Sequence, residues 1–105
     1  MIIGTIKEKK KFENRVAISP DEVKSYVKLG HQVLIEKNAG LLSGFNDKSY
    51  KEAGATISSA KDILKNIDIL LKINCPSPDE AKQLKNNAMI ISQLNIQNET
   101  DSIKI

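Results

Sequence analysis

Three side chains in this 105-residue sequence could act on a small ligand, and each is the only one of its type: Arg15, His31 and Cys75. Arginine binds carboxylates and phosphates through two parallel hydrogen bonds, a geometry that lysine cannot copy. Arg15 follows the first predicted strand, at the edge of the sheet where α/β proteins bind ligands. Two interpretations of Arg15 therefore stay open: it binds an anionic ligand, or it pairs with a neighbouring acid such as Glu13.

His31 and Cys75 are expected to be structural residues. His31 lies where a predicted helix meets a strand, and no acid or nucleophile is near it in the sequence, so we predict no catalytic residue in this chain. Cys75 follows an apolar run, and a free cysteine in such a place is typically a small buried hydrophobic residue. One cysteine and one histidine cannot supply the four ligands of a usual structural zinc site, so no metal is predicted.

The sequence contains no phosphate-binding fingerprint. Its five glycines, at positions 4, 30, 40, 44 and 54, form neither G-x-G-x-x-G nor G-x-x-x-x-G-K-[ST]. The net charge is +3, and a lysine cluster at positions 7, 9, 10 and 11 is predicted to be a solvated loop. With 4% aromatic residues and a single arginine, nucleic acid is not an expected partner.

Predicted strands and helices alternate along the chain. The strands are expected at 1–6, 32–36, 55–57, 67–73 and 88–94, and the helices at 20–29, from Asn46 or Asp47 to Gly54, after Ser59, after Ser77 and at 99–105. The tetrapeptide Ser-Pro-Asp-Glu occurs at 19–22 and again at 77–80, and each copy is a helix start with a capping box. Such alternation predicts an α/β fold: a Rossmann-like three-layer sandwich with a mostly parallel sheet of about five strands.

Three runs of the sequence carry a family resemblance: KEKKKFENRVAISPDEV, GHQVLIEKNAG and SGFNDKSYKEAGA. In this order and spacing they resemble the N-terminal domain shared by alanine dehydrogenases and the alpha subunit of NAD(P) transhydrogenase, over about the first 95 residues. The resemblance implies a protein of two Rossmann-like domains with the cofactor fingerprint in the second. Residues 1–105 are then expected to be a single, truncated N-terminal domain without the NAD-binding second domain.

Two asparagines favour the transhydrogenase branch of this resemblance. In alanine dehydrogenases the substrate carboxylate is held by an arginine that matches Arg15, by a lysine in K-V-K-E-P and by a histidine in Y-L-H. This sequence has Asn74 in place of the lysine and Asn95 in place of the histidine. Its segment LLKINCP is similar to the L-K-x-N-x-P pattern of the transhydrogenase alpha subunit.

The resemblance implies a function for the complete enzyme: hydride transfer between NADH and NADP, coupled to proton translocation through a membrane-embedded transhydrogenase subunit. It also implies a homodimer, located in the cytoplasm and peripheral to the inner membrane. NAD and NADP are the expected cofactors of the complete enzyme, and the isolated chain is expected to be inactive and not to bind them. Arg15 is the one position carried over as a cofactor-binding residue, lining the cleft between domains. Two alternatives stay open, a non-catalytic stub of a split or decayed gene and an alanine dehydrogenase fragment.

Overall fold

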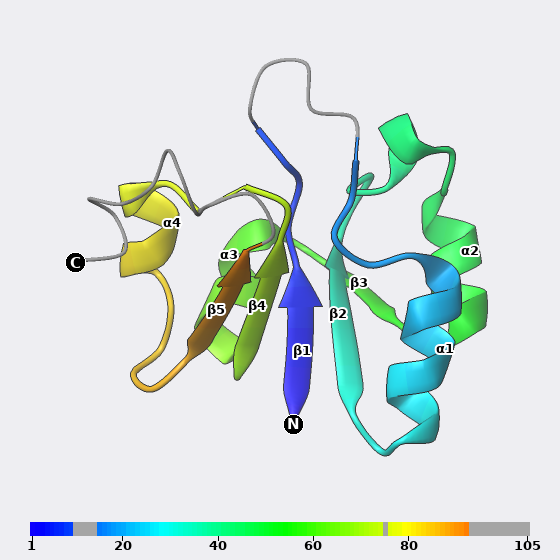
Figure 1. Cartoon of the computed structure of the whole chain (residues 1–105), viewed down its shortest axis with the longest axis horizontal. Helices are drawn as coiled ribbons and strands as arrows, with labels where there is room; N and C mark the ends of the chain where they lie inside the picture. Colours follow the sequence, from blue (N-terminus) through cyan, green and yellow to red (C-terminus); the bar gives the residue numbers. More distant parts are fainter. Residues whose placement is uncertain (10–14, 75, 93–105) are drawn as a thin grey trace.

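The central feature of the chain is a five-stranded sheet in the order β3-β2-β1-β4-β5, in which every pair of neighbours is parallel (Figure 1). The computed structural model describes residues 1–9, 15–74 and 76–92. The strands are β1 (Ile2–Thr5), β2 (Gln32–Glu36), β3 (Thr56–Ser58), β4 (Ile69–Lys72) and β5 (Met89–Ser92). The predicted α/β class is confirmed, and the sheet is fully parallel over the described strands.

Helices cover both faces of the sheet, as the sequence predicts. They are α1 (Pro20–Lys28), the 3-10 helix η1 (Leu41–Ser43), α2 (Asp47–Ala53), α3 (Ala60–Asn66) and α4 (Pro78–Lys82). Val23 of α1 and Tyr50 of α2 belong to a core cluster with Val33 and Ile35 of β2. Ile63 of α3 belongs to a second cluster with residues of the opposite face of the sheet. The result is the predicted three-layer arrangement, with α1 and α2 on one face and α3 on the other (Figure 1).

Both Ser-Pro-Asp-Glu copies start helices, which confirms the capping-box prediction. The hydroxyl of Ser19 accepts a hydrogen bond from the backbone N–H of Glu22 at 3.3 Å, and the Glu22 carboxylate accepts one from the Ser19 N–H at 2.9 Å. Ser77 and Glu80 repeat the arrangement: the Ser77 hydroxyl accepts the Glu80 N–H at 3.2 Å, and the Glu80 carboxylate accepts the Ser77 N–H at 2.9 Å. The same capping box therefore begins α1 and α4. The two glutamates differ in burial: Glu22 is exposed, whereas Glu80 is 5% exposed.

The central strand β1 is packed closely against α3. A Cβ atom on Gly4 would lie 2.6 Å from Cγ2 of Ile67 and 2.8 Å from Cγ2 of Ile63. These distances are shorter than van der Waals contacts allow, so a side chain at this position would push α3 away from the sheet. The close packing of α3 on β1 therefore explains the glycine at position 4, although glycine within a strand otherwise weakens pairing.

Several element boundaries differ from those predicted. The strand expected at 67–73 begins at Ile69, because Ile67 is the C-cap of α3 and is fully buried there. No helix is predicted between the strand at 32–36 and the helix that starts at Asn46 or Asp47, but η1 lies there. The lysine cluster is predicted to be a solvated loop, and Lys7 and Lys9 are exposed, but the intervening Glu8 has a side chain that is only 2% exposed. The predicted helix at 99–105 lies outside the described residues.

One half of the sheet has less cover than the other. Met89, Ile90 and Ile91 of the edge strand β5 are 56%, 42% and 47% exposed. Alternation along the strands places Met89 and Ile91 on the same face as the half-buried Ile69 and Leu71 of β4. We call these four residues the open apolar face; α1 and α2 lie on this side of the sheet over the β1–β3 half (Figure 1).

Candidate functional site

A pocket of about 230 Å³ lies beyond the carboxyl ends of β1 and β2. It is lined by Lys7, Glu8, Arg15, Asn38, Ala39, Leu41 and Leu42. The lining thus combines two cationic side chains, two leucines and the carboxylate-bearing Glu8. This edge of a parallel sheet is where α/β proteins bind ligands, and the pocket's volume suits a ligand of a few heavy atoms.

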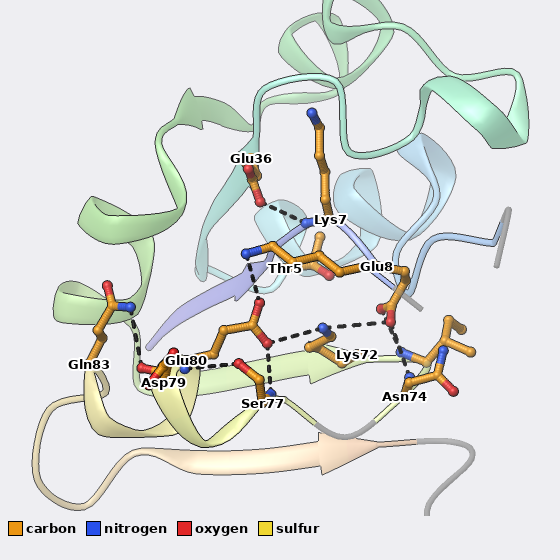
Figure 2. A network of polar contacts seen from close by, with 12 residues as sticks. Thr5, Lys7, Glu8, Glu36, Lys72, Asn74, Ser77, Asp79, Glu80 and Gln83 are labelled. Atoms are coloured by element: carbon orange, nitrogen blue, oxygen red, sulfur yellow. Dashed lines mark hydrogen bonds and ion pairs between the residues drawn. The ribbon is translucent and has the colours of Figure 1, made fainter. Parts of the chain in front are cut away.

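The backbone around the pocket is fixed by carboxylates from neighbouring elements. The N–H of Lys7 donates to Oε1 of Glu36 at the end of β2, over 2.7 Å (Figure 2). The N–H of Asn38 donates to Oδ1 of Asp47 at the start of α2, over 2.8 Å. Asn38 has φ of 64°, a left-handed conformation that asparagine tolerates better than most residues. The loops after β1 and β2 are therefore held where they face each other.

Glu8, one of the residues that line this pocket, also connects the end of β1 to the end of β4. Its carboxylate accepts hydrogen bonds from the backbone N–H of Ile73 at 2.8 Å and of Asn74 at 3.2 Å. Its Oε1 also lies 3.7 Å from the ammonium of Lys72. Figure 2 shows the Glu8 carboxylate pointing toward Lys72 and the backbone of Asn74. A buried carboxylate is thereby supplied with the donors that its ionised form requires.

Lys72 is the cation at the centre of this buried cluster. Its side chain is 3% exposed, and its ammonium lies 3.5 Å from Oε1 of Glu80 as well as 3.7 Å from Glu8. Lys9, 66% exposed, places its ammonium 3.3 Å from Oε2 of Glu80. We call Glu8, Lys72 and Glu80 the ion cluster (Figure 2); it contains two carboxylates and one ammonium. The exposed Lys9 lies at its rim.

The pKa of the Glu80 carboxyl is lowered from its ordinary value of 4.5. Burial acts in the opposite direction and is the largest single influence. The hydrogen bond from the Ser77 N–H and the charges of Lys72 and Lys9 together outweigh it. Glu80 is therefore ionised at neutral pH and keeps the second negative charge of the ion cluster.

The structure places the residues singled out in the sequence at different ends of the sheet. Arg15 lines the pocket, and Asn74, 9% exposed, follows β4 at the same carboxyl edge. His31 lies at the opposite edge, just before β2, with its Nδ1 3.5 Å from the amino group of Met1. Three residues weighed in the sequence analysis lie outside the described part of the chain: Glu13, Cys75 and Asn95.

Sequence reasoning missed the ion cluster, although one signal pointed to it. Lys72 interrupts the apolar run IDILLKI, and a lysine within a buried strand requires carboxylate partners. Its partners, Glu8 and Glu80, are 64 and 8 residues away, and each has another explanation in the sequence. Glu8 lies in a lysine-rich segment, and Glu80 completes a capping box.

Within the described ranges, no three His, Cys, Asp or Glu side chains come together as a metal-binding group. No helix in that part of the chain is long and apolar enough to cross a membrane.

The parallel order β3-β2-β1-β4-β5, with a pocket at the carboxyl edge, defines a Rossmann-like domain of the kind found in dehydrogenases. The chain belongs to the family described as "Alanine dehydrogenase/PNT, N-terminal domain", which matches residues 4–104. The resemblance stated from the sequence motifs is thus confirmed.

Relatives from both branches are similar to the chain. The alanine dehydrogenase of Staphylococcus haemolyticus is 42% identical over 99 residues, which are 94% of this chain and 26% of the relative. The NAD(P) transhydrogenase subunit alpha of Haemophilus influenzae is 38% identical over 92 residues, 88% of this chain and 18% of the relative. Both are oxidoreductases, and the chain spans about a quarter or less of their length.

Solved structures from both branches share the fold. An L-alanine dehydrogenase superposes with a TM-score of 0.82 at 38% identity, covering 88% of this chain and 26% of that one. A transhydrogenase from Sinorhizobium meliloti superposes with a TM-score of 0.89 at 32% identity, covering 98% of this chain and 31% of that one. Sequence identity is thus higher to the alanine dehydrogenase, and the TM-score is higher to the transhydrogenase.

Proposed function

We propose that this chain is an N-terminal domain of the alpha subunit of a proton-translocating NAD(P) transhydrogenase. The complete enzyme would transfer hydride between NADH and NADP, and this domain would form one wall of the nucleotide cleft. The observation that carries the proposal is Asn74. It follows β4 at the pocket's edge of the sheet, and the resemblance assigns to this position the substrate lysine of alanine dehydrogenases.

The charges at the carboxyl edge support this choice. Reduction of a 2-oxo acid needs a cation for the substrate carboxylate and a proton donor for the developing alkoxide. Asn74 is neutral, and the buried ammonium two residues earlier, on Lys72, is already paired with Glu8 and Glu80. Lys72 therefore does not supply the cation that Asn74 lacks. Arg15 and Lys7 can attract an anionic group of either substrate class.

Alanine dehydrogenase is the second candidate, because the alanine dehydrogenases reported above have the higher sequence identities. A fragment of that enzyme would need a different residue to bind the substrate carboxylate beside Arg15. The two functions can therefore be distinguished by activity once this domain is joined to a complete second domain.

The proposal predicts transhydrogenase activity in a chimera. Residues 1–92 would replace the matching segment of the Haemophilus influenzae alpha subunit, which would then be assembled with its membrane partner. We expect NADH-dependent reduction of an NADP analogue in membranes within about tenfold of the parent, since the site's charge pattern is retained. The parent and a chimera with Arg15→Ala are the controls. A folded, membrane-bound chimera without transhydrogenase activity would contradict the proposal and favour the stub or the alanine dehydrogenase fragment.

The chain by itself is predicted to bind NADH very weakly or not at all. Pyrophosphate binding uses the backbone N–H groups of a glycine-rich turn that leads into a helix. In each of the two helices that begin with proline, the cap serine already accepts the N–H of the third helical residue, and acids lie in the first turn. Titration calorimetry at physiological salt tests this. Saturable binding tighter than about 100 μM, about 5.5 kcal/mol, would contradict it.

We also propose a homodimer, docked on the membrane-embedded subunit at the cytoplasmic face of the inner membrane. The open apolar face supports association, because contiguous apolar surface of this kind is uncommon on monomers. Light scattering of the isolated chain should give a mass above that of the monomer. Ile91→Lys should lower it by placing a charge on that face, and Lys24→Ala on exposed α1 is the control. A sharp monomer mass at high concentration would contradict self-association.

A further inference from the structure

The ion cluster lies where an open α/β sheet usually binds its ligand. From β1 the chain passes to β2 on one side, and it later returns to β4 on the other side, so the strand order reverses between β1 and β4. Ligands of such sheets bind in the crevice beyond the carboxyl ends of the two strands at this reversal. Here that place is filled by the buried side chain of Glu8, which follows β1, and by the backbone of Ile73 and Asn74, which follow β4.

The groups that bind Glu8 are those that would bind an anionic ligand. Two consecutive backbone N–H groups and an ammonium converge on its carboxylate, at 2.8, 3.2 and 3.7 Å. Consecutive N–H groups with a nearby lysine are a common phosphate-binding arrangement. The Glu8 side chain is 2% exposed, so its carboxylate fills this arrangement from within the chain (Figure 2).

The two sides of β1 differ in the charged groups that lie beside the strand end. On the β4 side, Glu8 and Glu80 place two carboxylates around one buried ammonium. On the β2 side, the two cations Lys7 and Arg15 line the pocket, and Glu8 contributes to the same lining. An anion that approached the β4 side would have to displace a buried carboxylate and would remain close to a second one.

We propose that Glu8 is a specificity-determining residue that acts as a built-in anion: it closes the crevice between β1 and β4 to phosphate-bearing ligands and confines them to the β1–β2 pocket. This inference goes beyond the proposed function and holds for either oxidoreductase. It makes Glu8 more than a structural ion-pair partner, because its removal should create an anion site and not only weaken the fold.

The test uses the backbone amide resonances of Ile73 and Asn74 during a titration of the 105-residue chain with inorganic phosphate. In the wild type, these two resonances should not shift saturably. In Glu8→Ala they should shift together and saturate, with a Kd at least about tenfold lower than any value found for the wild type. Acetate should do the same, because a carboxylate matches the group that was removed. Glu36→Ala is the matched control: it removes the carboxylate that accepts the Lys7 N–H at the end of β2 and leaves the crevice intact.

Glu8→Gln guards against a folding failure of the alanine variant. Its amide keeps the shape of the side chain and one carbonyl acceptor but removes the negative charge, so it should also respond to phosphate at Asn74. Saturable shifts of Ile73 and Asn74 in the wild type would overturn the proposal. It would equally be overturned if folded Glu8→Ala or Glu8→Gln did not respond to either anion.

Discussion

A chimera of residues 1–105 with the rest of the Staphylococcus haemolyticus alanine dehydrogenase should not oxidise alanine. The resemblance places Asn74 and Asn95 where that enzyme class has a lysine and a histidine. Each lost charged or proton-donating group costs about 2–4 kcal/mol of transition-state stabilisation in a closed site. Two such losses lower kcat/KM by about 10³- to 10⁶-fold, so we expect no NADH formation from alanine and NAD above background in an assay at 340 nm.

The same chimera with Asn74→Lys and Asn95→His tests whether these two positions cause the loss of activity. If the two asparagines are what exclude alanine, the double variant should recover measurable activity, and each single variant should recover less. Lys24→Ala, on the exposed side of α1, is the control for a substitution that should leave the activity of the chimera unchanged. Measurable alanine oxidation by the unmodified chimera would contradict the transhydrogenase assignment.

Replacement of Lys72 by methionine should destabilise the domain by about 3–5 kcal/mol, because Glu8 and Glu80 would be left in a buried site without the cation that lies between them. A domain of this size has a total stability of about 5–15 kcal/mol, so the variant should lose a large share of it and unfold at a clearly lower urea concentration. Urea unfolding followed by circular dichroism measures the change. Lys24→Met removes an exposed lysine from α1 and should change the stability by no more than about 0.5 kcal/mol.

A triple variant separates the loss of the cation from the loss of packing. Lys72→Met combined with Glu8→Gln and Glu80→Gln removes every charge from the ion cluster. It should recover part of the stability that Lys72→Met loses, since no uncompensated charge remains buried. If Lys72→Met unfolded at the same urea concentration as the wild type, the ammonium would not be the balancing charge of this cluster.

Local signals in the sequence were sufficient to predict the layers of this fold. The two Ser-Pro-Asp-Glu copies fix their helix starts by contacts over three residues, and both helices begin as predicted. The apolar run before Cys75 was predicted as a strand for a similar reason, because burial of a short strand is visible in its own composition. Its start was two residues too early, since the buried Ile67 ends a helix, and apolar composition does not distinguish these two roles.

Arg15 is the only pocket-lining residue that the sequence analysis names as a ligand-binding residue. The ion cluster beside it was not predicted, for a physical reason. Glu8 reaches the N–H groups of residues 65 and 66 positions away, and no local pattern specifies which backbone groups a distant carboxylate will meet. Lys72 carried a signal in its place within an apolar run, but that signal says only that partners must exist. The partners follow from the strand order, which brings the ends of β1 and β4 together.

The central position of β1 also has a consequence for how the chain folds. Ile3 pairs with Val33 on one side and with Ile69 on the other, at separations of 30 and 66 residues. Both pairings are non-local, and a high contact order of this kind slows folding. As the chain emerges from the ribosome, its first strand stays without its second neighbour until most of the domain has been synthesised. Until then one edge of β1 is unpaired. Glycine at position 4 and the charged segment that follows β1 make this strand a poor template for pairing with other chains and so for aggregation.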